Sequence, residues 1–419
     1  MAIKQLSTAV PETLLTGRAL SPREQDFVAL AWDFLSGARP LRHELAEEWG
    51  LGDEDLALFH ETTDDVEIAE AAAALGWQKQ RWDAGFGWIN GPVQHGGRGL
   101  PDSFDRLYRA LEGAFEIPDM NPLRIGIGTV GPSLVRYGTP AQIAQFAVPL
   151  YGGQTVACQL FSEPAAGSDL AGVITRGARS DAGWVISGQK VWTSNAPFAD
   201  WGMALVRTDS EAPKHRGLTM IMVPMRVPGV EVRRLKQLTG GSSFAEVFLN
   251  GVEVPAENVV GAEGEGWAVA TATLAGERKA VGNRSHERIA RAVDLLRELA
   301  ERQGRFGDPL VREAWVRLYV RMVTVRLQQE KVESLPAEQQ SGAERAMDKL
   351  FVAAAFQEIG ECAAIILGPA FVADTGEWAT FAWSRWLLGS LGYRIAGGTE
   401  EILKTMLAER VLRLPREGK

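Results

Sequence analysis

The sequence has few cysteines, no long apolar run and no excess of basic residues, each of which a particular class of protein requires. Of its 419 residues only Cys158 and Cys362 are cysteines, and their separation excludes a disulfide framework and a CxxC metal site. The apolar runs, such as 71–75 and 363–367, are far shorter than the roughly 18–20 residues that span a bilayer. Basic residues number 44 against 53 acidic ones, a net charge of −9, so we expect neither a nucleic-acid surface nor a membrane surface.

Other signals are also missing. The 5 histidines have neither i, i+3 nor i, i+4 spacing, so we expect no metal site. Residues 126–131 match the dinucleotide pattern GxGxxG, but no apolar strand precedes them and no acidic residue follows at the required distance, so we interpret the match as chance. Residues 1–15 carry one lysine and no apolar block, which predicts no secretion signal and a cytoplasmic protein.

The residues that are present predict a large globular protein with an α+β fold. Hydrophobic residues make up 46% and charged residues 23% of the chain, which is enough for a sizeable core. The pattern is helical to about residue 150, then reads as successive short strands, and becomes helical again after Gly266. We predict an N-terminal helical domain (1–153), a central antiparallel β-barrel or sandwich (154–262) and a C-terminal helical bundle (263–419).

Three local patterns make this prediction specific. Ser103 is a candidate N-cap for a helix whose buried face carries Phe104, Leu107, Leu111 and Phe115. Asn250-Gly251, between two apolar runs, is the strongest hairpin signal in the chain. One long helix in the C-terminal region is expected to bury a stripe made of Trp315, Leu318, Tyr319, Met322 and Val325.

Two blocks of sequence carry the chemistry. Residues 158–172, CQLFSEPAAGSDLAG, read as a strand that runs into a turn whose amides and hydroxyls suit a phosphate or the polar edge of a ring. Residues 188–195, GQKVWTSN, place an indole and a hydroxyl two residues apart on one strand face. Taken singly, the first block is compatible with an ordinary polar loop and the second with a core tryptophan.

Together the two blocks closely resemble the signatures of the acyl-CoA dehydrogenase family of flavoproteins. The family reads T/S-E-P-x-A-G-S-D, followed about twenty residues later by G-x-K-x-W-x-[ST]-N. The resemblance continues through residues 244–255, the GEGW run at 264–267, GGTEEI at 397–402 and AER at 408–410. It covers nearly the whole chain in family order, and the family shares the helix–strand–helix arrangement.

The resemblance implies a site for the isoalloxazine ring of FAD between the β region and the C-terminal helices. Ser162 matches a strand-end position that stabilises negative charge on the reduced ring, and Ser168 matches a serine near the pyrophosphate and the thioester end of the substrate. Trp192 matches the aromatic residue that packs on the flavin, and Ser194 the hydroxyl donor to its reactive nitrogen. The other matches to cofactor contacts are Gln159, Phe161 and Thr399.

The family chemistry needs a carboxylate base that removes the α-proton of an acyl thioester while hydride leaves the β-carbon. Many members carry this glutamate directly before the Gly-Thr of the last motif, where this sequence has Gly397. A smaller branch carries it on the first long C-terminal helix, before an arginine, as in Glu277-Arg278 here. We therefore predict Glu277 as the base, with Arg278 beside the substrate. The Gly397 N–H matches the group that polarises the thioester carbonyl.

The sequence departs from the family where a neighbouring subunit completes the cofactor site. The family has Arg-x-x-Phe-Gly, but Gln303 stands at the arginine position before Phe306, and Arg302 and Arg305 flank it. Either arginine is a candidate for reaching the neighbour's FAD. Residues 367–370 replace the family's glutamine-glycine run, which faces the adenosine.

The leading hypothesis is an FAD-dependent acyl-CoA dehydrogenase of lipid metabolism, such as fatty-acid β-oxidation. It would act on an acyl-CoA thioester, pass electrons to an electron-transfer flavoprotein and assemble as a homodimer or homotetramer. One alternative keeps the fold but reduces enoyl thioesters or uses oxygen. The other alternative is a non-catalytic partner subunit of a hetero-oligomer.

Overall fold

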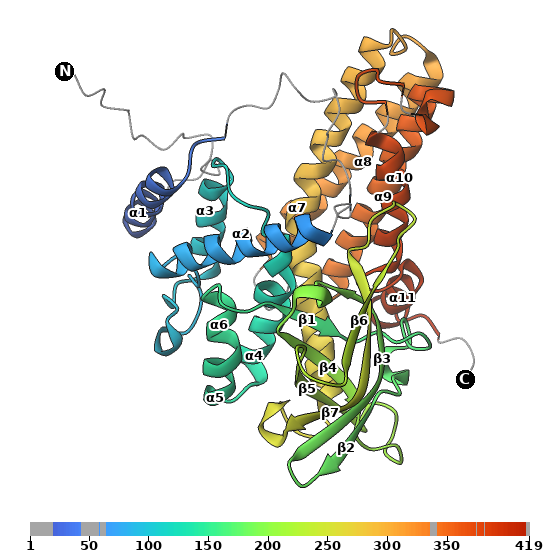
Figure 1. Cartoon of the computed structure of the whole chain (residues 1–419). Coiled ribbons are helices and arrows are strands. Elements are labelled where there is room, and N and C mark those ends of the chain that lie inside the picture. The colour runs from blue at the N-terminus through green and yellow to red at the C-terminus, as the bar shows by residue number, and fades with distance from the viewer. Residues whose placement is uncertain are drawn as a thin grey trace, which may run out of the picture.

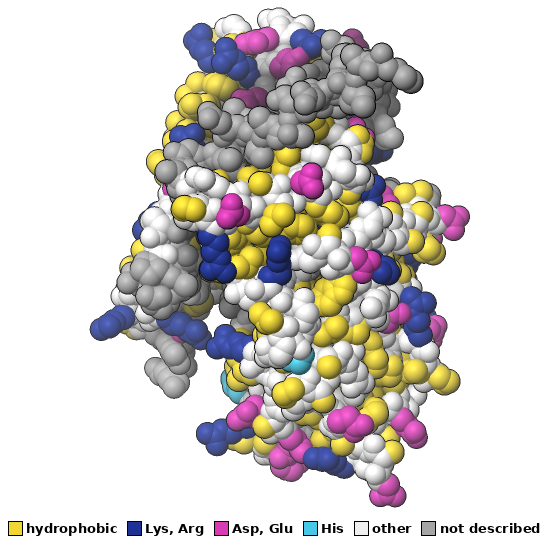
Figure 2. Space-filling model, turned by 90° about the vertical axis from the view of Figure 1, so that its left-hand side faces the viewer, with side chains coloured by type: hydrophobic (Ala, Val, Ile, Leu, Met, Phe, Trp, Pro, Cys, Tyr) yellow, Lys and Arg dark blue, Asp and Glu magenta, His cyan; other side chains and the backbone are white. Residues whose placement is uncertain are grey.

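The computed structural model describes residues 20–42, 58, 64–335, 342–373, 375–380 and 382–415, excluding the side chains of 275–284 and 333. Helices occupy both ends of the chain and strands its middle, which confirms the predicted α+β fold (Figure 1). On the face shown in Figure 2, basic and acidic side chains are interspersed among apolar ones, and no large basic area is visible there.

The N-terminal helices pack through aromatic side chains. α1 begins at a capping box in which Ser21 and Glu24 satisfy each other's backbone N–H groups, and Pro22 stands at its first position. Phe27 lies edge-on to Phe104 in a shared core cluster. The helices are α1 (Pro22–Ala38), α2 (Asp64–Asp83), α3 (Asp102–Glu112), α4 (Gly131–Tyr137), α5 (Pro140–Gln142) and α6 (Val148–Tyr151).

Two of the predictions for this region can be tested directly. α3 buries Phe104, Leu107 and Leu111 as expected, but Ser103 lies inside the helix, and Pro101 is its N-cap because a proline suits the extended conformation just before the helix. Gly126–Val130 form a π-helical turn rather than a phosphate-binding loop. The GxGxxG match therefore lacks the strand–turn–helix context of a dinucleotide site.

The middle of the chain forms a strongly twisted sheet, at the bottom of Figure 1. Its order is β6-β7-β3-β2-β4-β5-β8, with β1 added against β4. Most neighbours are antiparallel, whereas β1–β4 and a short β2–β4 contact are parallel. The strands are β1 (Ala157–Leu160), β2 (Arg176–Ser180), β3 (Gly183–Ser194), β4 (Trp201–Arg207), β5 (Leu218–Pro224), β6 (Val230–Leu235), β7 (Phe244–Pro255) and β8 (Val259–Val260).

The hairpin predicted at Asn250-Gly251 is wrong. Both residues lie inside β7, which pairs with β3 on one side and β6 on the other. The register slips by one residue there, because Ile186 faces Val252 whereas Gly188 faces Leu249. Gly251 accommodates this bulge at a φ of 68°. The same Asn-Gly pair that suits a tight turn also suits a bulge.

The C-terminal helices form an upright bundle above the sheet in the view of Figure 1. α7 (Gly266–Arg302) contacts β4, β5 and α4 as well as α8 and α9, so it joins the bundle to the rest of the molecule. Of the predicted stripe, Leu318 and Val325 are buried, Trp315 and Met322 are half-buried, and Tyr319 is exposed. The other helices are α8 (Pro309–Ser334), α9 (Gly342–Leu367), α10 (Ala382–Ile395) and α11 (Glu400–Met406).

One hydrophobic cluster crosses all three regions. It includes Trp88 and Tyr151, whose rings stack at 4.0 Å, together with Met203 of β4 and Val269 of α7. The three-domain division at 153 and 262 stays a prediction. The segment Gly342–Val372 is long and apolar enough to cross a membrane, but 56% of its most apolar window is buried inside the protein.

Candidate active site

The first motif block forms a tight turn at the end of β1. Glu163 and Ala166 exchange two backbone hydrogen bonds of 3.0 Å, which closes the turn around Pro164. Gln159 and Ser162 are half-buried, and Ser168 is exposed. Phe161 is buried in the core, so its side chain faces away from solvent and only its backbone remains for contact with a ligand.

The second block ends in a bulge that exposes Trp192. The register of β3 against β7 slips between Lys190 and Thr193, and Trp192 adopts a φ of 60°. A positive φ is rare for a bulky residue, and such strain is concentrated at functional sites. The indole is 62% exposed, with Phe244 edge-on at 6.1 Å. Trp192 is therefore not the core residue that its strand position alone would suggest.

The two blocks are adjacent in space. The Val191 N–H donates to the Ser162 carbonyl over 2.9 Å, which fixes the end of the first block beside the bulge of the second. Neither the Ser162 nor the Ser194 hydroxyl bonds to another residue in the described part of the chain. These hydroxyls and the exposed indole are thus available to a bound group with a flat face and a polar edge.

A buried ion pair lies beneath this surface. Lys190 Nζ lies 2.8 Å from Glu163 Oε1, and the two side chains are 0% and 2% exposed. Both residues lie within the motif blocks, but the sequence alone predicts a role for neither of them. The sequence did hold a signal for this pair: a lysine two positions before Trp192 and a glutamate directly after Ser162, in segments that also carry apolar residues. Lysine and glutamate are almost never buried unless they are paired.

The ionisation of the pair follows from its surroundings. Burial alone would raise the pKa of Glu163, but Lys190 and the N–H groups of Ile174 and Thr175 outweigh it and hold that pKa below its usual value. Burial lowers the pKa of Lys190 to about 8, although Glu163 opposes the shift. At neutral pH both groups are charged.

On the helical side, the last motif forms a loop between α10 and α11. Gly397 and Gly398 have φ values of 66° and 96°, and Thr399 caps α11 by accepting the Ile402 N–H over 3.3 Å. Lys349 of α9 donates to the Gly398 carbonyl over 2.9 Å and so ties the loop to the bundle. The Thr399 hydroxyl therefore already serves as the N-cap of α11.

The predicted base lies on α7. The side chains of Glu277 and Arg278 lie outside the described residues, so their roles stay predictions. On either side of them α7 is anchored by buried polar contacts. Thr273 lies 2.8 Å from Ser133 of α4, and His286 lies 3.1 Å from Asp348 of α9.

The two candidate arginines are both engaged within the chain. Arg302 pairs with Glu298 over 2.7 Å, and its guanidinium lies 4.5 Å from the Trp378 ring centroid in a surface pocket. Arg305 donates to the Ile365 and Ile366 carbonyls and pairs with Asp308. Of the two, Arg302 is the more exposed, and reaching a neighbour would require it to leave its partners.

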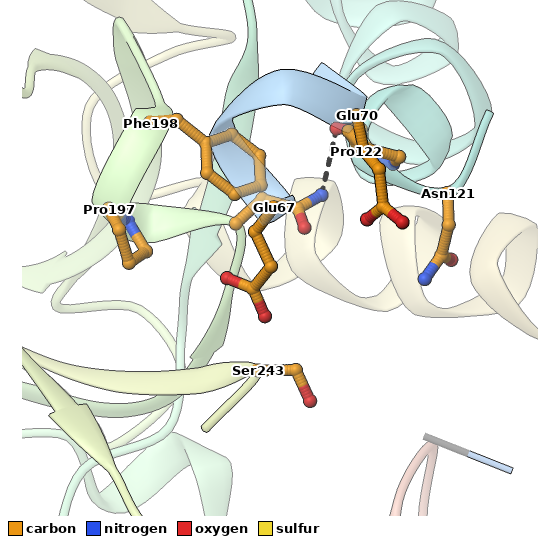
Figure 3. A pocket seen from close by; sticks show the side chains of 8 residues that line it. Glu67, Glu70, Asn121, Pro122, Pro197, Phe198 and Ser243 are labelled. Atoms are coloured by element: carbon orange, nitrogen blue, oxygen red, sulfur yellow. Dashed lines mark hydrogen bonds between the residues drawn. The ribbon is translucent and has the colours of Figure 1, made fainter. Parts of the chain in front are cut away.

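A second pocket lies at the seam between α2 and the sheet (Figure 3). Its cavity measures only about 30 Å³, and Glu67 and Glu70 present carboxylates to it. Arg234 of β6 pairs with Glu67, so the recess is partly neutralised. The dashed line in Figure 3 is the 2.9 Å bond from Asn195 to the Pro122 carbonyl. No predicted site residue whose side chain the structure describes lines this pocket.

Comparison with known families decides the assignment. The family model "Acyl-CoA dehydrogenase, middle domain" matches residues 158–252, and "Acyl-CoA dehydrogenase, C-terminal domain" matches 264–412. A relative from Mycobacterium tuberculosis, acyl-CoA dehydrogenase IpdE1, is 37% identical over 82% of this chain and 88% of its own length. The chain belongs to the acyl-CoA dehydrogenase family. The members of this family are oxidoreductases that act on CH–CH groups.

Other members of the acyl-CoA dehydrogenase family are similar to this chain in sequence or in fold. Acyl-CoA dehydrogenase FadE34 of M. tuberculosis is 40% identical over 68% of this chain and 39% of its own length. A solved structure titled "Tcur3481-Tcur3483 steroid ACAD G363A variant" superposes with a TM-score of 0.73 and 26% identity, covering 94% of this chain and 99% of that one. The family supports a flavin of the FAD type as the cofactor.

Proposed function

We propose that this chain is an FAD-dependent acyl-CoA dehydrogenase that introduces an α,β double bond into an acyl-CoA thioester. The observation that carries the proposal is the strained, exposed Trp192 beside Ser162, joined by the Val191–Ser162 hydrogen bond. The free hydroxyls of Ser162 and Ser194 suit the polar edge of an isoalloxazine ring, and the indole suits its face.

In this proposal, Trp192, Ser162 and Ser194 hold the ring, with Gln159, the Phe161 backbone, Ser168 and Thr399 contributing the remaining contacts. When bound, FAD supplies the two-electron acceptor for a hydride from the substrate β-carbon. Glu277 takes the α-proton, and the two electrons of that C–H bond become the new C=C bond. Arg278 and the Gly397 N–H orient the thioester, because a positioned donor stabilises the charge that develops on its carbonyl oxygen.

We propose a steroid-derived acyl thioester as the first substrate class to test, ahead of straight fatty acyl chains. The support is the similarity to a structure titled a steroid ACAD. Its two-part title also supports assembly with a second, different chain. An electron-transfer flavoprotein as acceptor and a cytoplasmic location stay predictions.

The test is anaerobic reduction of the purified protein. We expect visible flavin absorbance that bleaches with a steroid-derived acyl-CoA, and more slowly with straight-chain acyl-CoA thioesters. A colourless protein that does not take up added FAD would contradict the proposal that this chain holds the cofactor. Flavin that no thioester bleaches would instead favour the reductase or oxygen-using alternative.

A further inference from the structure

The buried pair of Glu163 and Lys190 joins more of the chain than its own two residues. Lys190 Nζ donates to the carbonyls of Phe161 and Leu205, at 3.1 and 2.6 Å, as well as to Glu163. These three acceptors use all three N–H bonds of an ammonium group. One lysine therefore connects the end of β1, the strand β4 and its own strand β3.

Glu163 extends this network to a fourth segment. Its Oε2 accepts the Ile174 N–H over 2.7 Å, and its Oε1 accepts the Thr175 N–H over 2.9 Å. Ile174 and Thr175 lie directly before β2. The carboxylate therefore connects the turn that follows Ser162 to the entrance of the neighbouring strand.

The position of the pair matters more than its contribution to stability. Replacing a buried ion pair by apolar groups of similar size is often neutral or stabilising, because desolvation offsets the attraction. Lys190 is two residues from Trp192, and Glu163 follows Ser162 directly. The hydrogen bond from Val191 to Ser162 lies between them. The ligand-facing residues of both motif blocks are thus attached to the pair through one or two peptide units.

We propose that Glu163 and Lys190 are positioning residues, which hold Ser162 and the Trp192 bulge in the arrangement that receives the flavin ring. This inference rests on the proposed function, since it presumes that the ring binds at this surface. Neither side chain reaches the ligand itself, because both are buried beneath it. Without the pair, the protein should still fold, but Ser162 and Trp192 should no longer be held in one arrangement for the flavin ring.

The test compares FAD binding by the wild type with that of the double variant Lys190→Met/Glu163→Gln, which removes both charges and keeps the volume. The matched control is Arg321→Met/Glu358→Gln, a bidentate pair between α8 and α9 for which the described side chains show no bond to a site residue. The readouts are the dissociation constants of FAD and of lumiflavin, the fine structure of the flavin absorption band, and the thermal midpoint of unfolding.

We expect the double variant to keep its thermal midpoint near that of the wild type and to bind FAD and lumiflavin at least about tenfold more weakly, or about 1.4 kcal/mol. The absorption band should lose fine structure, because a loosely held ring resembles one in water. The control should bind both ligands within about twofold of the wild type. A folded double variant with wild-type affinity and spectrum would overturn the inference.

Two further outcomes separate the inference from the function on which it depends. If the wild-type protein bound no flavin, the proposed function itself would be contradicted, and the inference with it. If the double variant does not fold, the single variant Glu163→Gln tests the inference instead, because glutamine retains one acceptor oxygen and the packing of the side chain. It should weaken lumiflavin binding by at least about threefold, whereas an affinity within about twofold of the wild type would overturn the inference.

Discussion

The sheet side and the helical side of the site are built in different ways. On the sheet side, Glu163 and Lys190 are fully buried, and their bonds fix backbone groups of four chain segments. On the helical side, the arginines near the end of α7 take part in exposed pairs such as Arg302–Glu298, at 55% and 45% exposure. The sheet side is a closed network, whereas the arginine end of α7 is adjustable surface.

The difference indicates what each side can contribute. A buried, fully bonded network keeps its geometry without a ligand, so the sheet side is preorganised for a rigid ring. Exposed ion pairs are worth little and exchange partners readily. The helical side is therefore suited to contacts that form only when another subunit is present.

Glu277→Gln tests the helical side where the proposed chemistry occurs. Glutamine keeps the shape but cannot accept a proton, so we expect turnover to fall by about 10²- to 10⁴-fold. Flavin absorbance should be unchanged, which stopped-flow reduction and a static spectrum measure together. Glu287→Gln, an exposed position on the same helix, is the control. Turnover retained in Glu277→Gln would exclude this glutamate as the base.

Lys190→Met tests the closed network by removing one partner. The Glu163 carboxylate stays buried without its cation, which should lower the free energy of unfolding by about 3–5 kcal/mol. Urea denaturation measures the loss. The double variant with Glu163→Gln should recover most of it. If the single and double variants were equally unstable, the coupling between these charges would be absent.

The ionisation of Lys190 gives the closed network a pH signature of its own. Its pKa is lowered from 10.5 to about 8 in the folded protein, so between these values the unfolded chain binds more protons. This group therefore makes the folded state more stable as pH rises from 8 to 10.5. Over the same range we expect flavin affinity to fall, because a neutral amine has one N–H fewer to hold the surrounding carbonyls. Urea midpoints and FAD titrations at both ends of that window, each relative to the double variant, isolate the effect.

Comparing Trp192→Gly with Trp192→Ala separates the contribution of the indole from the cost of the strained backbone at this position. Both variants remove the indole, but only glycine adopts a φ of 60° freely. We expect the glycine variant to be more stable than the alanine variant by about 1 kcal/mol, as the cost of the left-handed region suggests. Thermal unfolding of the two proteins checks the order. Equal stability would mean that the bulge relaxes when the ring is lost.

Arg302→Met should have the smallest effect on the isolated chain. Its pair with Glu298 is exposed, and its contact with Trp378 lies at the surface, so we expect a loss of no more than about 1 kcal/mol. A larger effect on flavin retention in the assembled oligomer than in the isolated chain would mark this arginine as a cross-subunit contact. Equal effects in both would assign it a local role.

Much of this architecture could be predicted from the sequence, for physical reasons that differ by residue. The helix–strand–helix order follows from apolar periodicity, and the turn of residues 180–183 links β2 to β3 as its composition indicates. Asn250-Gly251 was misread because a positive φ serves a bulge as well as a turn, and only pairing on both edges of β7 decides between them.

The supporting parts of the site were harder to predict because they depend on long-range contacts. Glu163 and Lys190 are 27 residues apart, and no local spacing rule relates them. Similarly, the Arg305 side chain bonds to carbonyls some 60 residues away, which no motif encodes. The family motifs predict which residues face the ligand, whereas the residues that support them follow from tertiary structure.

The hydrophobic cluster that contains Trp88 and Tyr151 also governs the order in which the chain can fold during synthesis. Its remaining apolar partners extend to Val269 and Ala270, more than a hundred residues later. At about 5–20 residues per second, the ribosome needs on the order of ten seconds to supply them. Until then the apolar face of the N-terminal helices is covered only by the strands, so the emergence of α7 completes the core of the first two-thirds of the molecule.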